Sequence, residues 1–315
     1  MLAELLCGYN MSLGIDQLKR LESFFINSKF RQHGAVITDL DGTAVHEVEG
    51  KTVIHRNVER GLKKIYDVGR PVVVNTLRFP LSVIRTFGVD WYKISHTPIP
   101  VVLLNGSQLG FIAKMDDEFI FEQLVSFPLM KEEINEVLNK VKKFTKEDIS
   151  NIILFYYPEN WEKGEVIWTP DPSRIPHLQQ KYPSASTVFS VQLTDLEKES
   201  LASPVCMILL LADIPGDRLM AYQHTRRSNF ITRRGVTNSF GAEKIAELLK
   251  IDLQHSIGAG DTDMDNFLNV VGLSVHVGNS KLSYQGISDT LRLSTFNEFG
   301  DLLYKFAEMQ QSVLK

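Results

Sequence analysis

Short apolar runs alternate with amphipathic segments in the first third of the chain, after an amphipathic, helical stretch at residues 1–33. Helical periodicity recurs between the runs, at residues 57–68 and 80–87. The runs are of strand length and lie at residues 35–39, 71–75 and 101–105. Uninterrupted apolar strands that alternate with helices predict a parallel sheet covered by helices on both faces.

The pattern changes after Gly106 and returns near residue 236. The intervening segment predicts a long helix at 131–144, a second helix at 217–224, and strands at 152–157, 165–168, 187–193 and 205–211. Alternating elements then resume at 241–250, 256–260, 265–270 and 273–277. We therefore expect an N-terminal helical extension (1–33), a Rossmann-like α/β core (34–108 and 236–315) and an inserted α+β cap domain (109–235).

Composition narrows the class of protein. The chain has 315 residues, 43% of them apolar, and a formal net charge of −4, which does not suggest a nucleic-acid binder. Cys7 and Cys206 match no metal or redox spacing. No apolar run approaches the ~20 residues that cross a bilayer, and the first residues do not resemble a signal peptide. We expect a cytoplasmic protein with no membrane or nucleic-acid partner, while its oligomeric state stays open.

Acidic and polar residues follow the predicted strands. Asp39 and Asp41 end the first strand, Asn75-Thr76 and Asn105 end the next two, and Asp261 ends a fourth. Ligands of open α/β sheets bind outside the carboxyl ends of the strands, so these side chains predict one site. Asp265 belongs to the same acidic cluster as Asp261, and such an oxygen-rich cluster suits Mg²⁺.

Simpler readings compete with this site. An Asp-Gly turn after a strand accounts for Asp41-Gly42 without any chemistry, and helix capping accounts for either Asp261 or Asp265. Neither reading explains why acids recur at two separate strand ends.

The pattern Asp39-x-Asp41-Gly42-Thr43, followed by Thr76 and by Gly260-Asp261-x-x-x-Asp265, resembles the haloacid dehalogenase (HAD) superfamily of phosphotransferases. The long insertion resembles the type-2 cap of that superfamily. The Asn105-Gly106-Ser107 stretch is similar to its Cof-like and sugar-phosphate phosphatase branch.

The resemblance implies a role for each matched residue. Asp39 is the implied nucleophile, and Asp41 is the implied acid and base. Thr76 is expected to hydrogen-bond the transferring phosphoryl group. Asn105 and Arg78 are expected near the substrate.

The resemblance also implies how the cofactor and the phosphate are bound. Mg²⁺ is expected to bind Asp39, the Asp41 backbone carbonyl and Asp261, with Asp265 as a ligand or behind one. The backbone amides of the turn through Gly42 and Thr43 are expected to contact the phosphate.

Two positions depart from the family pattern. Leu77 replaces the glycine of a Thr-Gly-Arg triplet. Lys244 is the candidate for the lysine that pairs with the nucleophile, although related chains place it a few residues earlier, near Asn238 here. A solvated helix lysine is the simpler reading of Lys244, and Arg233 or Arg234 is an alternative source of positive charge.

The leading hypothesis is a Mg²⁺-dependent phosphatase that hydrolyses a small phosphate ester, in particular a sugar phosphate, through an aspartyl-phosphate. A phosphomutase that uses the same two aspartates is the first alternative. A non-catalytic protein that kept the fold for binding or regulation is the second. Fold kinship does not carry substrate specificity, so the substrate itself is not predicted.

Overall fold

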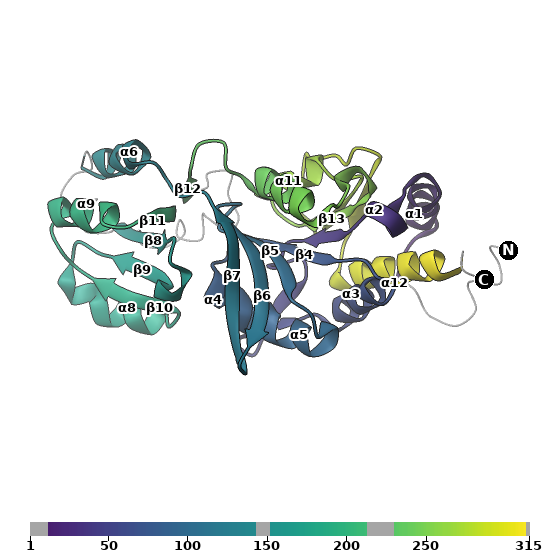
Figure 1. The fold of residues 1–315 in the computed structure, drawn as a ribbon, viewed down its shortest axis with the longest axis horizontal. Helices are drawn as coiled ribbons and strands as arrows, with labels where there is room; N and C mark the ends of the chain where they lie inside the picture. The colour runs from purple at the N-terminus through teal and green to yellow at the C-terminus, as the bar shows by residue number, and fades with distance from the viewer. Residues whose placement is uncertain (1–11, 143–151, 213–229, 313–315) are drawn as a thin grey trace.

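The computed structural model describes residues 12–142, 152–212 and 230–312, and it shows an α/β core beside an inserted cap (Figure 1). The core sheet has eight strands in the order β15-β14-β13-β1-β4-β5-β6-β7. The first six in this order are parallel, namely β15 (Asp289–Leu293), β14 (Leu273–Val277), β13 (Ile257–Gly260), β1 (Val36–Thr38), β4 (Val72–Asn75) and β5 (Ile99–Leu103). The predicted α/β class with a parallel core sheet is confirmed.

Both faces of this sheet are buried, which explains the uninterrupted apolar runs. Val36 packs in a cluster with residues of α3 and α12, whereas its neighbour Ile37 packs with residues of α11. Successive side chains of a strand point to opposite faces, so both must be apolar where helices cover both. The helices of the core are α1 (Ile15–Asn27), α2 (Phe30–His33), α3 (Arg56–Asp67), α4 (Pro80–Val83), α5 (Val89–Ser95), α11 (Asn238–Leu249) and α12 (Phe296–Ser312).

Two short elements accompany this core. A π-helical turn (Ile84–Gly88) joins α4 to α5, and a 3-10 turn (Asn266–Asn269) stands where the sequence predicts a helix at 265–270. A separate hairpin of β2 (Val45–Val48) and β3 (Lys51–Ile54) follows the first acidic motif.

The core is larger than the sequence predicts at the entry to the cap. Strands β6 (Gln108–Met115) and β7 (Glu118–Ser126) form an antiparallel hairpin on the edge of the core sheet. The predicted boundary between residues 108 and 109 therefore falls at the start of this hairpin, and the sheet pairing assigns the hairpin to the core. Backbone pairing of β6 with β5 decides this, and the apolar pattern of the segment does not reveal its partner.

The N-terminal helix α1 packs on the core of its own chain. Phe24 and Phe25 contact Phe306 of α12, and Arg20 forms an ion pair with Asp289 at the start of β15. The apolar stripe of this helix thus packs largely against the core of the same chain.

The cap contains a sheet of five strands, in the order β10-β9-β8-β11-β12, with helices beside it. Ile152, Leu154 and Tyr156 pack with α6 and α9, whereas the alternate residues Phe155 and Tyr157 lie on the opposite face of the sheet. The cap elements are α6 (Lys131–Val141), β8 (Ile152–Pro158), β9 (Glu165–Trp168), α8 (Ile175–Lys181), β10 (Ala185–Phe189), α9 (Leu193–Leu201), β11 (Val205–Ala212) and β12 (Phe230–Thr232). The helix expected at 217–224 lies outside the described residues.

The chain crosses between core and cap twice, after β7 and after β12, and one side chain ties the two crossings together. The Glu133 carboxylate is 9% exposed and accepts hydrogen bonds from two backbone amides. One is the amide of Met130 on the first crossing, and the other is the amide of Arg234 on the second, each at 2.8 Å. The crossings are therefore coupled through a single buried carboxylate.

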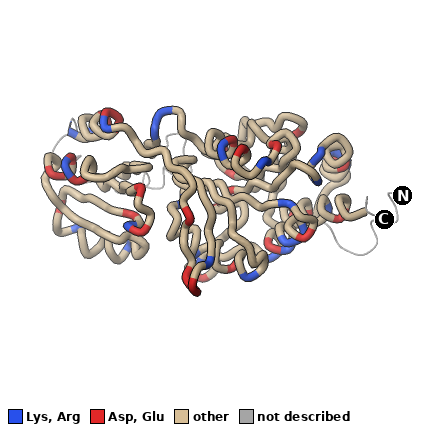
Figure 2. Tube along the Cα trace, in the orientation of Figure 1, with Lys and Arg blue, Asp and Glu red and all other residues tan. Residues whose placement is uncertain are grey.

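Charged residues of both signs are interspersed along the core and the cap (Figure 2), in keeping with the small net charge of the chain. Among the described residues, none of the helices combines the length and the apolar character needed to span a bilayer.

Candidate active site

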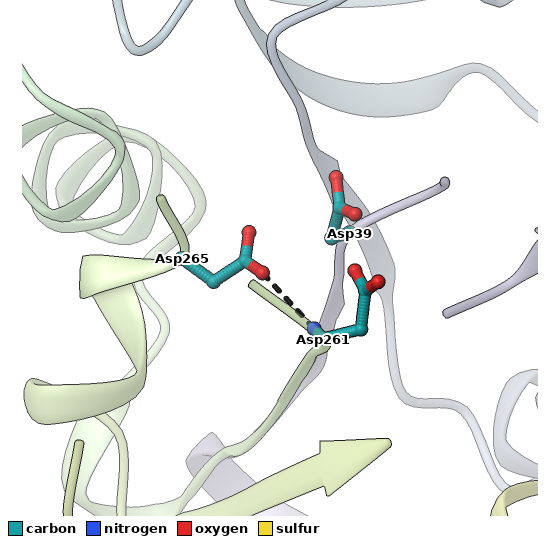
Figure 3. Close-up of side chains that lie close together, drawn as sticks. All are labelled: Asp39, Asp261 and Asp265. Carbon is teal, nitrogen blue, oxygen red and sulfur yellow. Dashed lines mark hydrogen bonds between the residues drawn. The ribbon is translucent and has the colours of Figure 1, made fainter. Parts of the chain in front are cut away.

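Three aspartates converge at the carboxyl ends of two neighbouring parallel strands (Figure 3). Asp39 follows β1, and Asp261 and Asp265 follow β13; β1 and β13 are paired directly. Oxygen atoms of the three carboxylates lie within 4.8 Å of one another. Asp39 is 8% exposed and Asp265 is 2% exposed. The acids at these two strand ends are therefore brought together, as the sequence predicts.

Local hydrogen bonds determine the shape of the second acidic loop. The Oδ2 atom of Asp265 accepts bonds from the backbone amides of Asp261 and Thr262, at 3.0 and 2.9 Å, and from the Thr262 hydroxyl at 3.2 Å. Asp265 thus holds the loop through one oxygen. The capping role that the sequence allows for this residue is not observed: its side chain makes no capping bond to the 3-10 turn that follows, and it bonds the preceding loop instead.

The first acidic loop approaches the second so closely that only glycine fits between them. Gly42 has φ of +75°, and a Cβ atom at this position would lie 2.2 Å from Oδ2 of Asp261. The next residue, Thr43, donates a hydrogen bond of 3.4 Å from its hydroxyl to Oδ1 of Asp261. The Asp-Gly turn therefore serves to bring the two loops together.

The crowding of acids changes their protonation. Burial, followed by the charges of Asp265, Asp261 and Asp41, raises the pKa of Asp39 well above its ordinary value. Burial and the charge of Asp265 raise the pKa of Asp261 to about 7. Burial also raises the pKa of Asp265 to about 6, although hydrogen bonds from the loop oppose the rise. Neutralising this cluster therefore requires protons or a cation.

The residues present fit a divalent cation with oxygen ligands. The cluster offers carboxylate oxygens only, which suits Mg²⁺ better than metals that prefer nitrogen or sulfur. The missing side chain of Gly42 leaves the Asp261 carboxylate accessible from the first loop. Asp39, Asp261 and Asp265 are the side chains that would hold the ion.

We expect the stability of the protein in EDTA to fall as the pH rises from 5 to 8. The folded-state pKa of Asp261, about 7, lies above its ordinary value of 3.8, so folding favours the protonated form. Its stabilising contribution is complete below pH ~4 and is lost as the pH rises through ~7. Mg²⁺ should reverse the loss at pH 8, with a shift in Tm on the order of 5 °C.

Thermal unfolding at pH 5, 6.5 and 8, with EDTA or Mg²⁺, measures this effect. Asp261→Asn should reduce both the pH dependence and the response to Mg²⁺. A Tm at pH 8 that does not respond to Mg²⁺ would contradict the cation site.

Asp41 occupies a more open position beside this cluster. Its side chain is 53% exposed and forms a two-pronged ion pair with Arg78, at 2.7 Å from Nε and 2.5 Å from Nη2. Arg78 also bonds the hydroxyls of Ser82 and Thr86. The guanidinium is thus anchored at the mouth of the site. Among the described side chains, Arg78 is the cation that contacts the first acidic motif directly.

Thr76 completes this part of the site. It follows β4 and is 1% exposed, and its amide donates to the carbonyl of Val102 at 2.9 Å. Its hydroxyl accepts a bond from the amide of Arg78 at 3.3 Å. These bonds of Thr76 therefore fix the backbone position of Arg78, from which its side chain extends.

These residues line a cavity of about 550 Å³ between core and cap. Asp39, Asp41, Gly42, Thr76 and Arg78 all contribute to its wall. The volume lies in the range typical of small-molecule sites, about 300–1,000 Å³. The core provides the acidic end of the cavity and the cap provides the opposite wall.

The structure does not bring Lys244 to this cavity. Its amine forms an ion pair with Glu247, 2.8 Å away, on the surface of α11. Asn238, six positions earlier, is buried and lines the cavity. Lys244 fails as a site residue because it lies further along α11 and points to the helix surface. Arg233 and Arg234 are exposed and do not line the cavity either.

Asn105 has a different position from the one expected for a substrate-binding residue. Its amide group donates to the Thr232 hydroxyl at 3.1 Å, and its Oδ1 accepts from the Asn238 amide at 3.1 Å. Asn105 does not line the cavity; it joins the core to the strand that leaves the cap. Its φ of 57° also places it in the left-handed region, where Asn is tolerated.

Several cavity residues carry no signal in the sequence. Glu165 and Tyr157 lie on cap strands, and His46 lies on the hairpin after the first motif. The place of His46 on the cavity wall depends on the pairing of β2 with β3, which the sequence does not show. Pairing of cap strands determines which face reaches the cavity, and no local pattern shows it.

The fold and the site together define a capped α/β enzyme core with an acidic centre at the strand ends. A family model described as haloacid dehalogenase-like hydrolase matches residues 36–295, and the chain belongs to this family. No curated protein sequence gives a significant match.

Solved structures share the fold at low sequence identity. A phosphatase of the haloalkanoate dehalogenase superfamily, BT1666 from Bacteroides thetaiotaomicron, aligns with TM-score 0.61 and 16% identity, over 89% of this chain and 96% of its own. The subclass IIB sugar phosphatase BT4131 aligns with TM-score 0.61 and 15% identity, over 88% and 99%. A protein described as HAD/Cof-like from Plasmodium vivax aligns with TM-score 0.65 and 15% identity, over 94% and 100%. These likenesses, at 15–16% identity, show that this chain shares the fold of these solved structures over nearly its whole length.

Proposed function

We propose that this protein is a Mg²⁺-dependent phosphatase that hydrolyses a small phosphate monoester through an aspartyl-phosphate. One observation carries the proposal: the buried Asp39 carboxylate lies among the acids of a second loop, at the end of a cavity that also contains Asp41. A nucleophile, a separate acid and a cation site are what such a reaction requires.

In the first step, an oxygen of Asp39 attacks the phosphorus of the substrate. The bond between phosphorus and the ester oxygen breaks as the new bond forms. Protonated Asp41 gives its proton to the departing oxygen, so the organic group leaves as an alcohol. Asp41 is suited to this role because it lies beside the cluster and is exposed to the cavity.

In the second step, water attacks the phosphorus of the aspartyl-phosphate. The Asp41 carboxylate takes a proton from this water, the bond to Asp39 breaks, and inorganic phosphate leaves. The proton taken from water restores protonated Asp41, so both aspartates are ready for another cycle. When bound by Asp39, Asp261 and Asp265, Mg²⁺ supplies positive charge that offsets the negative charge of the phosphoryl group.

Other residues are proposed to bind the phosphoryl group. The Thr76 hydroxyl and the Gly42 amide lie at the same strand ends and can donate hydrogen bonds. The Thr43 amide already donates to the carbonyl of Leu40 at 3.2 Å. The phosphoryl oxygens offer the Arg78 guanidinium an alternative anionic partner, which would release Asp41 for proton transfer. Lys244 is left out of this set because its amine pairs with Glu247.

The size of the cavity favours a small metabolite over a macromolecular substrate. The fold neighbour described as a sugar phosphatase supports sugar phosphates as the first class to test. The phosphomutase alternative uses the same two aspartates, and no feature of the cavity favours it.

Purified protein should hydrolyse p-nitrophenyl phosphate and at least one sugar phosphate in the presence of Mg²⁺, and EDTA should abolish turnover. Release of inorganic phosphate without an added bisphosphate separates the phosphatase from the mutase. No turnover across sugar phosphates, nucleotides and phospho-acids, with Mg²⁺ still bound, would favour the non-catalytic alternative and overturn the proposal.

A further inference from the structure

The cap wall of the cavity is formed by one face of its sheet. Residues that alternate along β8 and β11 point to this face, while their neighbours pack against α6 and α9. Most of the side chains on this wall are apolar or aromatic, and they include Phe155, Tyr157, Met207, Leu209, Leu211 and Phe230. The organic part of a substrate whose phosphate is at Asp39 would face these residues.

Among the cap residues that the structure describes on this apolar wall, one carries a carboxyl group. Glu165, the first residue of β9, is 7% exposed and lines the cavity. The Tyr157 hydroxyl donates to its Oε2 atom at 2.6 Å, and the Ser184 hydroxyl also bonds the carboxyl. Both partners line the cavity. Glu165 is thus held in place by neighbouring donors in a polar spot on an apolar surface.

A buried carboxyl group in this setting needs hydrogen-bond donors. Burial raises the pKa of Glu165 above its ordinary value, and the bonds from Tyr157 and Ser184 oppose that rise. A carboxylate offers about four acceptor positions, so two donors leave room for a third. A ligand hydroxyl or ammonium group can fill it, whereas a ligand carboxylate or second phosphate would meet like charge.

We propose that Glu165 accepts a hydrogen bond from a hydroxyl or ammonium group on the organic part of the substrate. Glu165 thereby selects polyhydroxylated or amino-substituted phosphate esters over alkyl and acidic ones. This inference rests on the proposed phosphatase function and assigns the selection to a named residue of the cap. Sites built to bind a hydroxyl discriminate strongly against analogues that lack it, because the buried partner is then left unpaired.

The test compares wild type with Glu165→Gln on substrate pairs. In the variant, the single amide oxygen is taken by Tyr157 and Ser184, and the NH₂ group faces the ligand. We expect kcat/KM for the best hydroxylated substrate to fall about 10- to 100-fold. For p-nitrophenyl phosphate, which has no such donor, the change should be less than about threefold.

Deoxy analogues of the best substrate identify the interacting hydroxyl. For the analogue that lacks it, wild type and Glu165→Gln should have the same kcat/KM, as in a double-mutant cycle. Glucose 6-phosphate and glucosamine 6-phosphate distinguish a hydroxyl from an ammonium donor. One substrate should improve in the variant, which shows that the variant is folded. Relative to p-nitrophenyl phosphate, 2-phosphoglycolate, which has a carboxylate and no hydroxyl, should improve about fivefold because like-charge repulsion is removed.

The outcomes separate this inference from the function on which it rests. Wild-type turnover of p-nitrophenyl phosphate with Mg²⁺ establishes the phosphatase before any variant is compared. If Glu165→Gln then lowers all substrates equally, or none, the residue is structural and the inference alone is overturned. Absence of wild-type turnover overturns both.

Discussion

Asp39→Asn should reduce kcat by about 10⁴-fold or more in the presence of Mg²⁺. The amide cannot form the aspartyl-phosphate, so the reaction loses its nucleophile rather than a binding contact. The same substitution removes a buried carboxylate whose charge is opposed by Asp261 and Asp265. In EDTA at pH 8, the variant should therefore unfold at a higher temperature than wild type. Steady-state kinetics and thermal unfolding of one preparation measure both effects.

Asp263→Asn is the matched control for this experiment. Asp263 belongs to the same acidic loop but is exposed and does not line the cavity. Its variant should keep activity within about twofold. Substantial turnover by Asp39→Asn, with wild-type KM, would exclude the aspartyl-phosphate mechanism.

Asp41→Asn should slow the hydrolysis of alkyl phosphates by about 10²- to 10⁴-fold, since general acid and base catalysis are both lost. The nitrophenolate group leaves without a proton, so p-nitrophenyl phosphate should still form the aspartyl-phosphate more readily than an alkyl ester does. Its hydrolysis should stall at the second step. Rapid mixing should then show a burst of nitrophenolate of about one equivalent per enzyme, followed by slow turnover.

Asp67→Asn is a suitable control, because Asp67 is also paired with a cation, Lys63, at 2.8 Å but lies on the surface of α3. Its variant should behave as wild type. Equal losses for alkyl and aryl esters in Asp41→Asn, with no burst, would mean that Asp41 does not transfer protons.

Much of the core could be predicted because its strands are buried on both faces. Runs such as residues 71–75 cannot be solvent-exposed strands, and helices between them leave a parallel sheet as the simplest arrangement. The same reasoning finds the cap helix α6 and strands β8, β9 and β11 close to their observed bounds.

The hairpin β6–β7 and the C-terminal pair β15 and α12 were not predicted. Strand β7 lies at the sheet edge and contains exposed and half-exposed positions, so its apolar signal is weak. Helix α12 buries an unusually broad surface against α3 and the N-terminal helices, which mixes its apolar and polar positions. Tertiary packing determines these elements, and the local periodicity of the sequence does not show that packing.

The acidic half of the site was predictable for a geometrical reason. Parallel strands end at the same edge, so acids at separate strand ends must approach one another. The exact direction of a side chain on a helix is harder to predict, and Lys244 shows this. A shift of a few positions along α11 separates the buried Asn238 from Lys244, which is partly exposed and pairs with Glu247.

The wall of the cavity that faces the acids was not predictable at all. Glu165 begins a strand like many others, and it reaches the cavity because of the register between β9 and β8. The property that we expect to select the substrate is therefore a product of cap assembly. Sequence similarity between family members would reveal it only where this register is shared.

The bond that joins the two crossings through Glu133 has a mechanical consequence. The two connections cannot separate unless the bond from the Arg234 amide to Glu133 breaks, so we expect the two crossings to move together. The cap that carries Glu165 is thus attached to the core that carries Asp39 by two strands of chain that one side chain holds side by side.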